Sequence, residues 1–446
     1  MGLKYIEPIK SMILLLLVAL SITFTFSIWT YTPSYPTIEQ LPTVDASVSD
    51  SKKQIGEIIK PYKMVFNFGK TLSGTTTSDE INDVIEEMKE WHISDIEMVN
   101  NNFDVKDFNE LLRKPNRFIL YFHGEVPLSV YSSILNVDDS AVYLSEISFD
   151  RLVVDWNPDS IEMDIYFINR ANKKLHSAKV QAGDFRSFQR SVLAMGRELA
   201  EYKEVTVDGS PFLVVPVGPV EAKRNTYFQE EISPNRFRDA LFSDPNAVRR
   251  SQVGSNQEEF GDDHALMRID TEKKKLNYVY PVAKSEEPAI PSELLLSTID
   301  FVNEHGGWTD EFRYTYMNPK TRTVRFRLFL NGLPVFTDVT SSTEIIQRWG
   351  DNRIFSYTRP YYLRGWTPPS ETKVEVLPSG IDVAERLRQS DIIDFSAVEE
   401  IAPGYFMKHD VERSLLVMEP SWFYLIKGNW TRFSPEQLGG ERIGLE

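Results

Sequence analysis

The histidines and the paired acids are the residues whose types could do chemistry, and their spacing matches no known catalytic arrangement. No two histidines occur as His-x-x-x-His or His-Glu-x-x-His, the spacings that place two zinc ligands on one face of a helix. Adjacent glutamates point apart on a helix or a strand, so such pairs are poor candidates for a general acid and base. The histidines stand at 92, 123, 176, 264, 305 and 409, and the glutamate pairs include those at 86–87, 230–231 and 399–400.

Two further groups of residues could bind a ligand, and each has a plainer interpretation. Gly261-Asp-Asp-His264 is the most ligand-like cluster for a metal, but a solvated loop before a strand explains it equally well. An aromatic group could line a groove for a glycan or a peptide, although a sheet core or an interface is the favoured interpretation. This group is Phe355, Tyr357, Tyr361, Tyr362 and Trp366. We therefore predict no enzyme, no catalytic or metal-binding residue and no cofactor.

The apolar run over residues 11–31 is the stretch around which the rest of the chain is organised. It holds no charge, no proline and no glycine, and as a helix it reaches about 30 Å, the thickness of a bilayer's hydrocarbon core. A cleaved signal peptide is the alternative, but its apolar core is shorter and ends in a small-x-small motif. Phe24, Phe26 and Trp29 crowd the end of this run instead. We expect one uncleaved transmembrane helix over residues 11–31.

The flanking charges predict the orientation of this helix. Lys4 and Lys10, against the single acid Glu7, make residues 1–10 a positively charged tail, which favours the cytoplasmic side. Trp29 and Tyr31 close the run with rings that prefer the membrane–water interface. The expected location is the cell membrane, with a single pass, a cytoplasmic N-terminus and the bulk of the chain extracellular.

Small and hydroxylated residues give one side of the predicted helix a distinct character. Ala19, Thr23 and Ser27 are spaced four residues apart and share a face, and Ser21 and Thr25 lie on a nearby one. Such residues let a second helix approach closely and offer hydrogen bonds in lipid. The alternative is that the hydroxyls bond back to their own helix backbone. We predict that Ala19, Thr23, Ser27, Ser21 and Thr25 form a helix–helix contact surface.

Composition limits the remaining function classes. The chain has 446 residues and no cysteine, which excludes disulfides and thiol chemistry and suits a bacterial exported domain. Its net charge of −16 opposes binding to nucleic acid or anionic lipid and favours a protein partner or a cationic ligand. The plainer interpretation, that the charge serves solubility, is at least as well supported.

The part after the helix is predicted to be α+β, with mostly antiparallel sheets and packed helices in several domains. Prolines and serines indicate an extracellular linker over residues 32–60. Hydrophobic periodicity and turn residues then predict an N-terminal α+β domain, a middle α+β domain and a C-terminal α+β domain. Their expected bounds are 61–204, 205–284 and 285–446.

Several local signals place individual elements. Ser78 is the predicted N-cap of a helix that continues to about Trp91, and apolar periodicity predicts a long helix over residues 184–202. Asn331-Gly332 predicts a tight hairpin. Residues 292–304 are predicted as a helix that ends at Gly306-Gly307.

The whole layout resembles the YycH family, also called WalH, which are membrane-anchored regulators of an essential sensor histidine kinase in Gram-positive bacteria. The residues that carry the resemblance are Lys10, the run end Trp29-Thr30-Tyr31-x-Pro33, the strand and loop over 65–78, and Lys89-Glu90-Trp91. Chain length, the missing cysteines and an exterior part of about three units also fit. The resemblance spans most of the chain, and its motifs are not catalytic.

The resemblance implies a membrane complex with a sensor histidine kinase (YycG, or WalK) and a YycI-like membrane-anchored protein. The transmembrane helix would pack on the membrane helices of the kinase and bias it between signalling states. The regulated output would be cell-wall metabolism, without a defined sign of regulation. An extracytoplasmic module that binds a ligand or the cell wall is the alternative function. A homo-oligomer stays open, and no nucleic-acid partner is expected.

Overall fold

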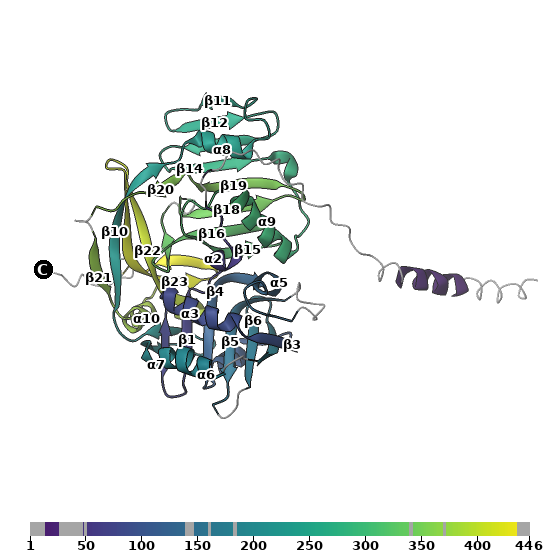
Figure 1. Ribbon diagram of the computed structural model, residues 1–446, viewed down its shortest axis with the longest axis vertical. Coiled ribbons are helices and arrows are strands. Elements are labelled where there is room, and N and C mark those ends of the chain that lie inside the picture. Colours follow the sequence, from purple (N-terminus) through teal and green to yellow (C-terminus); the bar gives the residue numbers. More distant parts are fainter. Residues whose placement is uncertain are drawn as a thin grey trace, which may run out of the picture. The chain divides into compact units, whose positions relative to one another are not determined.

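The computed structural model describes residues 14–25, 48, 51–138, 147–158, 162–181, 185–338, 342–368 and 372–434. The chain divides into two compact units, residues 1–39 and residues 40–446. In the first unit, residues 14–25 are helical. In the second unit, the described residues form a mixed α+β structure built on two large sheets (Figure 1). The predicted α+β class with mostly antiparallel sheets is therefore confirmed for this unit.

The first sheet has nine strands among the described residues, and all its neighbouring strands pair antiparallel. Its order across the sheet is β3 (His92–Asn100), β7 (Lys174–Gln181), β6 (Met163–Asn169), β5 (Ser148–Trp156), β4 (Arg117–Pro127), β1 (Lys63–Asn67), β2 (Leu72–Thr75), β8 (Ala200–Glu204) and β9 (Val214–Pro216). Strand β1 lies in the middle of this order, which explains why all five of its residues are buried.

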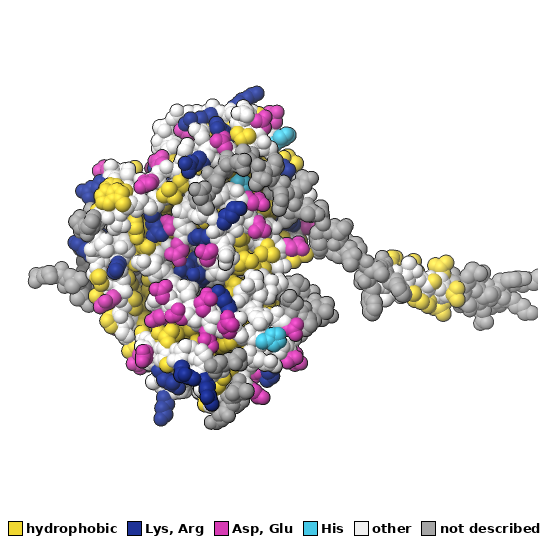
Figure 2. Space-filling view, in the orientation of Figure 1, with side chains coloured by type: hydrophobic (Ala, Val, Ile, Leu, Met, Phe, Trp, Pro, Cys, Tyr) yellow, Lys and Arg dark blue, Asp and Glu magenta, His cyan; other side chains and the backbone are white. Residues whose placement is uncertain are grey.

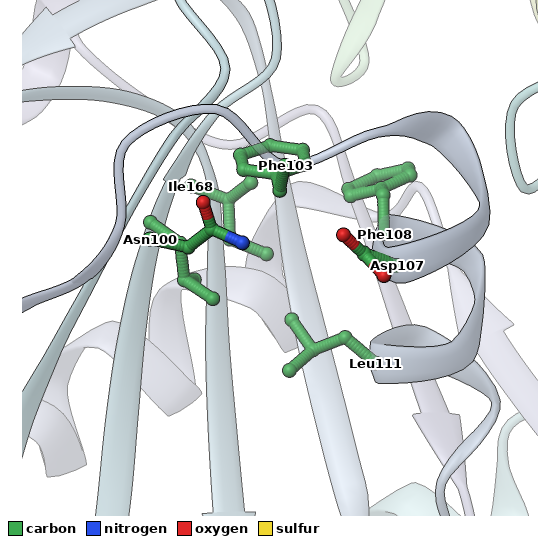
Figure 3. Close-up of a pocket in the computed structure, with 7 residues that line it drawn as sticks. Asn100, Phe103, Asp107, Phe108, Leu111 and Ile168 are labelled. Atoms are coloured by element: carbon green, nitrogen blue, oxygen red, sulfur yellow. The ribbon is translucent and has the colours of Figure 1, made fainter.

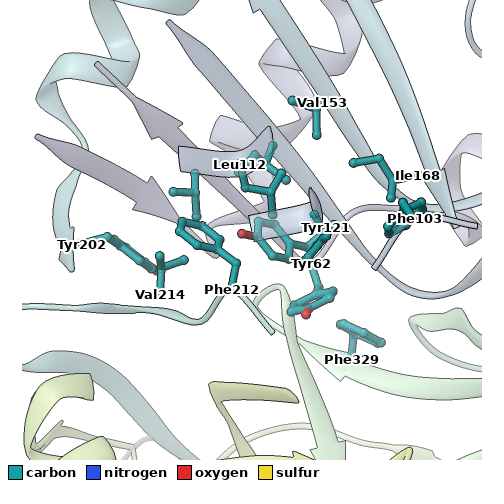
Figure 4. Close-up of a cluster of buried hydrophobic side chains, with 13 residues drawn as sticks. Tyr62, Phe103, Leu112, Tyr121, Val153, Ile168, Tyr202, Phe212, Val214 and Phe329 are labelled. Carbon is teal, nitrogen blue, oxygen red and sulfur yellow. The ribbon is translucent and has the colours of Figure 1, made fainter. Parts of the chain in front are cut away.

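Helices cover both faces of the first sheet. The helices of this part of the chain are α2 (Ile55–Ile58), α3 (Ser78–Lys89), α4 (Val105–Arg113), α5 (Leu128–Tyr131), α6 (Phe185–Phe188), the π-helical turn η2 (Gln189–Leu193) and α7 (Ala194–Glu198). Phe108 and Leu112 of α4 join a core cluster that includes Val65, Tyr121 and Phe329 (Figure 4). Phe329 comes from the second sheet, so the cores of the two sheets are continuous.

The second sheet has fifteen strands among the described residues, and only the pairing of β17 with β22 is parallel there. Its path is β11 (Arg249–Gln252), β12 (Gln257–Gly261), β13 (Leu266–Asp270), β14 (Lys275–Val279), β19 (Ile354–Pro360), β18 (Glu344–Trp349), β16 (Thr323–Leu330), β17 (Leu333–Phe336), β22 (Val398–Asp410), β23 (Leu415–Ile426), β10 (Val220–Glu231) and β20 (Tyr362–Arg364). Off this path, β15 (Phe312–Asn318) pairs with β16, β21 (Lys373–Leu377) with β10, and β24 (Asn429–Arg432) with β23.

The helices of the second part are α8 (Pro234–Leu241), α9 (Pro291–Glu304) and α10 (Gly380–Arg388), with short 3-10 turns η3 (Pro281–Ala283) and η6 (Phe395–Ala397). Val383, Ala384 and Leu387 of α10 pack in a second core cluster with Val215 of β9 and Trp422 of β23. Residues from both sheets therefore meet under α10 as well.

Several predicted elements are confirmed. Helix α9 ends at Glu304, and Gly306 follows with a φ of 57°, as the predicted glycine stop requires. Asn331 and Gly332 have φ values of 49° and 82°, and Leu330 pairs with Leu333 around them. Both central residues thus adopt the left-handed conformation of a type I′ hairpin.

Two local predictions are wrong. The helix predicted over 184–202 ends at Glu198, because residues 200–204 form β8 and pair with β2 through Tyr202 and Leu72. Ser78 is the first residue of α3 rather than its N-cap, which is Thr77. The hydroxyl of Ser78 instead accepts a hydrogen bond of 2.8 Å from Arg313 of β15. In both cases a contact with a distant strand outweighs the local signal.

The predicted domain bounds at 204/205 and 284/285 stay predictions. Strands between residues 63 and 216 form the first sheet, and strands between 220 and 432 form the second. Strands from the predicted middle and C-terminal domains pair directly, because β14 lies antiparallel to β19 with Tyr278 opposite Tyr357. The linker predicted over 32–60 lies mostly outside the described residues.

Candidate functional sites: the helix face and the junction of the two sheets

The predicted contact face is partly described in the first unit. Ala19, Ser21, Thr23 and Thr25 lie within the helix over residues 14–25, and Ser27 lies outside the described residues. The large apolar side chains of this helix are between 45% and 73% exposed. Among the described residues, no helix is both long enough and apolar enough to cross a membrane.

Two hydroxyls of this face bond within their own helix. Thr23 Oγ1 donates to the carbonyl of Ala19 at 2.8 Å, and Thr25 Oγ1 donates to the carbonyl of Ser21 at 2.8 Å. These are the backbone contacts that the plainer interpretation expects. Each hydroxyl oxygen still has lone pairs that can accept a hydrogen bond from another helix. The helix–helix contact surface therefore stays a prediction.

A buried ion pair joins the two sheets. Lys63 Nζ of β1 lies 2.6 Å from Glu400 Oε1 of β22, and each side chain is only 2% exposed. Burial lowers the pKa of Lys63, while the carboxylate of Glu400 acts in the opposite direction and favours the charged ammonium. Because an unpaired charge in this environment would be costly, each residue depends on the other.

Aromatic rings and hydrogen bonds complete the surroundings of this pair. Tyr62 donates its hydroxyl to Glu400 Oε2 at 2.8 Å, and the backbone N–H of Ile401 donates to Glu400 Oε1 at 3.1 Å. The ammonium of Lys63 lies 4.2 Å from the ring centroid of Tyr121, and the guanidinium of Arg151 lies 4.5 Å from it. Burial raises the pKa of Tyr62 well above its usual value, so this hydroxyl remains a donor. We call Tyr62, Lys63, Tyr121 and Glu400 the junction cluster.

A second carboxylate anchors the neighbouring arginines of the first sheet. Asp150 Oδ2 accepts from Arg170 Nε at 2.5 Å and from Arg151 at 3.2 Å. Burial alone would raise the pKa of Asp150, but the two guanidinium groups hold it below its usual value. Arg151 is thereby fixed where its charge faces Tyr121.

His123 of β4 lies beside the junction cluster. Its ring stacks on Tyr62 at 4.0 Å and meets Phe329 and Trp430 edge-on at 5.6 and 5.9 Å. Its Nε2 atom is buried and has no hydrogen-bond partner among the described residues. Burial, followed by the charges of Arg327, Arg151 and Arg313, lowers the pKa of His123 well below its usual value. This histidine is therefore neutral in the folded protein at neutral pH.

A second set of contacts ties β4 to β15. The hydroxyl of Tyr314 donates to the carbonyl of Glu125 at 2.5 Å. At Gly124 an added Cβ would lie 3.0 Å from the ring of Tyr314 and from the carbonyl oxygen of Thr315. Only glycine lets the two backbones approach this closely without displacing one of them. The Tyr314 hydroxyl and the close approach at Gly124 thus add to the contacts that Glu400 and the shared core clusters make between the two sheets.

One small pocket lies on the first sheet, between α4 and strands β6 and β7 (Figure 3). Its walls are mainly apolar, with Asn100 and Asp107 as the polar exceptions. The full lining is Asn100, Phe103, Asp107, Phe108, Leu111, Ile168 and Leu175. The cavity volume of about 50 Å³ suits a few waters rather than a substrate-sized molecule.

The other groups considered from the sequence have structural roles. Asp262 Oδ1 accepts from the backbone N–H of His264 and of Ala265 at 2.8 and 2.7 Å, so this cluster is a turn before β13. No group of metal-ligating side chains occurs within the described part of the chain. Of the aromatic group, Tyr357, Tyr361 and Tyr362 are buried, whereas Trp366 is 62% exposed. The favoured interpretation of a sheet core therefore holds for the three tyrosines.

Two family models match this chain. The N-terminal domain of the YycH protein matches residues 7–193, and the C-terminal domain of the YycH protein matches residues 210–436. The chain belongs to the YycH family. The two matched segments divide close to the point where the first sheet ends and the second begins.

Members of the YycH family also appear among curated proteins and solved structures. The two-component system WalR/WalK regulatory protein YycH of Bacillus subtilis is 19% identical over 456 residues, which cover 99% of each chain. The crystal structure of YycH from Bacillus subtilis has a TM-score of 0.72 with 17% identity, and the match covers 87% of this chain and all of that one. At this identity the structural likeness establishes the YycH fold.

Sequence reasoning missed the junction cluster. Glu399-Glu400 was weighed only as an acid–base pair, and the strand that contains Val65 only as part of the resemblance. The available signal was a lysine inside one strongly apolar strand and a glutamate inside another, because a buried charge needs a partner of opposite sign. Nothing in the sequence indicates which two strands meet.

Proposed function

We propose that this protein is a membrane-anchored, non-enzymatic regulatory subunit of a WalK-like (YycG-like) sensor histidine kinase that controls cell-wall metabolism. The observation that carries the proposal is membership of the YycH family, together with the relative named as a WalR/WalK regulatory protein. The absence of catalytic spacing among the histidines and acids fits a regulatory role.

The proposed anchor is the apolar run over residues 11–31, with residues 1–10 in the cytoplasm and the two sheets outside the cell. In this arrangement the face with Ala19, Thr23 and Ser27 packs on a membrane helix of the kinase. Such a helix shifts the kinase between signalling states only by its difference in affinity for the two states. A difference of about 1.4 kcal/mol would already change the ratio of the states tenfold.

A YycI-like membrane-anchored protein is the second proposed partner. Its contact would involve the exterior part, where basic and acidic side chains are interspersed over the face shown in Figure 2. The net charge of −16 disfavours anionic polymers as partners of this surface and favours a protein. The junction cluster supports this role because it holds the two sheets as one body against which a partner can bind.

The proposal is tested by affinity purification of the tagged full-length protein from mild detergent, beside a form without residues 1–31. We expect the kinase and the YycI-like protein with the full-length form, and a strong loss of the kinase without the helix. Equal recovery by both forms would place the contacts outside the membrane. Recovery of neither partner by either form would favour the alternative of an extracytoplasmic ligand- or wall-binding module.

A substitution on the helix face sharpens this test. Ala19→Leu with Thr23→Leu removes the close approach and one hydroxyl, and we expect kinase recovery to fall about tenfold, as for a lost helix contact of 1–2 kcal/mol. The matched control is Val18→Leu with Ile22→Leu, which has the same spacing on a neighbouring face of exposed apolar residues. Equal recovery by the two double variants would contradict the proposed contact face.

A further inference from the structure

Among the described residues, strand β21 has a hydrogen-bonded neighbour on one side only. Its five residues pair antiparallel with β10, from Lys373 opposite Arg224 to Leu377 opposite Val220. No other strand of the described residues pairs with β21, which lies at the outer side of the second sheet beside β10 (Figure 1). The outer edge therefore presents backbone groups to which another strand can bond.

The polarity of β21 is inverted relative to a strand that faces water. Val374 and Val376 are 60% and 62% exposed, although alternate residues on a solvent face are normally polar. Glu375 points to the opposite side, where its carboxylate lies 3.3 Å from Arg224. Leu377 faces the core cluster under α10. A pair of exposed valines on an open edge indicates that another surface covers them.

We propose that β21 pairs with β21 of a second copy of this chain, antiparallel about a twofold axis at Glu375. In this register Lys373 lies opposite Leu377 of the other copy, and the two Glu375 residues lie opposite each other. Val374 of one copy lies opposite Val376 of the other, so the axis brings four valines together on one face. An isologous contact of this kind closes after two copies.

The charges around this axis fit a second copy. On the valine face, Glu221 of β10 lies beside Val376, and Lys223 of β10 lies beside Val374. Because Val376 of one copy lies opposite Val374 of the other, each cross-strand pair of valines has a glutamate at one end and a lysine at the other. On the other face, the two Glu375 carboxylates meet at the axis, where like charges would repel. Each is already bound by Arg224, and Lys373 of the opposite copy lies diagonal to it. Two carboxylates are thus surrounded by four cations.

A contact through a five-residue strand is small, so the dimer belongs to the class of weak interfaces. The test therefore traps it covalently and uses the absence of cysteine from the chain. Glu375→Cys places the two new thiols opposite each other across the axis, about 4.5–5.5 Å apart between Cα atoms, which a disulfide can span. The tagged full-length protein is oxidised in its membrane and separated under non-reducing conditions.

Two single-cysteine variants control for register and for random collision. Val374→Cys places its thiol opposite residue 376 of the other copy. Residue 374 of the other copy lies diagonally across at about 7–8 Å, which is beyond the reach of a disulfide. It should crosslink only when mixed with Val376→Cys. Ser251→Cys places an exposed thiol on β11, the strand at the other end of the sheet path, and should stay monomeric.

We expect a disulfide-linked dimer from Glu375→Cys, and we expect Val376→Lys in the same chain to reduce it at least tenfold. Val376 is exposed, so this lysine leaves the fold intact and adds two cations at the axis. A monomeric Glu375→Cys protein, or equal crosslinking of Glu375→Cys and Ser251→Cys, would overturn the proposal. Adding Ala19→Leu and Thr23→Leu should leave the crosslink unchanged, which separates this contact from the proposed kinase contact.

Discussion

At the scale of single residues, the main feature is a set of charges and polar atoms withdrawn from water. Lys63 and Glu400 neutralise each other, and Asp150 binds two arginines. His123 differs from these residues because its Nε2 atom has no partner among the described residues and its neighbours include three arginines. A proton on this ring would add a cation where cations already prevail.

This arrangement predicts an acid-sensitive stability. The folded protein lowers the pKa of His123, so the unfolded chain binds a proton more readily, and stability falls as pH decreases below about 6.5. We expect His123→Phe to reduce the stability loss between pH 7.5 and pH 5.0 by about 2 kcal/mol, measured by urea unfolding at both values.

His264→Phe is the control for this measurement, since His264 is exposed in the turn before β13. It should lose as much stability on acidification as the unchanged protein. Other histidines with a lowered pKa, such as His176 and His305, contribute equally to all three proteins and cancel in the comparison. An identical pH dependence for His123→Phe would contradict the assignment.

At the scale of elements, caps and turns decide where helices begin and hairpins close. Ser379 is the N-cap of α10, and its Oγ accepts from the backbone N–H of Asp382 at 3.1 Å. The Asp382 carboxylate in turn accepts from the backbone N–H of Ser379 at 3.2 Å. Helix α10 covers the core cluster to which both sheets contribute, so its start affects more than one element.

Ser379→Ala should lower the free energy of unfolding by about 1 kcal/mol, because the backbone N–H of Asp382 loses its side-chain acceptor. The control is Thr77→Ala at the N-cap of α3, whose side chain makes no capping hydrogen bond. Chemical denaturation of both variants should show the larger loss for Ser379→Ala. A larger loss for Thr77→Ala would show that the capping geometry does not govern these helix starts.

Local sequence signals predicted the elements whose own residues fix the backbone. The Asn331-Gly332 turn and the glycine stop after α9 follow from positive φ values that few residues adopt. The residues of β8 predict the end of a helix, because their partner strand β2 comes much earlier in the chain and leaves no local signal. The junction cluster was missed for the same reason, since the ion pair depends on which strands meet rather than on local propensity.

At the scale of the whole second unit, the ion pair between Lys63 and Glu400 couples the stability of the two sheets. Glu400→Gln leaves the ammonium of Lys63 buried without a counter-charge, and we expect a loss of about 3–5 kcal/mol in unfolding free energy. Amide hydrogen exchange should accelerate in β1 and β22 together. If hydrogen exchange accelerated in β22 alone, the stabilities of the two sheets would not be coupled through this ion pair.

A double-mutant cycle completes this test. Lys63→Met with Glu400→Gln removes both charges and keeps an acceptor for the Tyr62 hydroxyl. The double variant should therefore lose clearly less unfolding free energy than the two single variants lose together. Lys179→Met is the matched control, because Lys179 pairs with Asp164 on the surface of the same sheet and is 62% exposed. Lys179→Met should change the free energy of unfolding by no more than about 0.5 kcal/mol.

The separation of Lys63 and Glu400 along the chain also affects how the protein acquires its structure. The two residues are 337 positions apart, and β1 lies in the middle of the first sheet. During synthesis, all strands of the first sheet leave the ribosome long before β22 does. Lys63 therefore has no counter-charge until Glu400 has been synthesised. Contacts between such distant residues form slowly. We expect the half-built molecule to be the species most exposed to proteases and to aggregation.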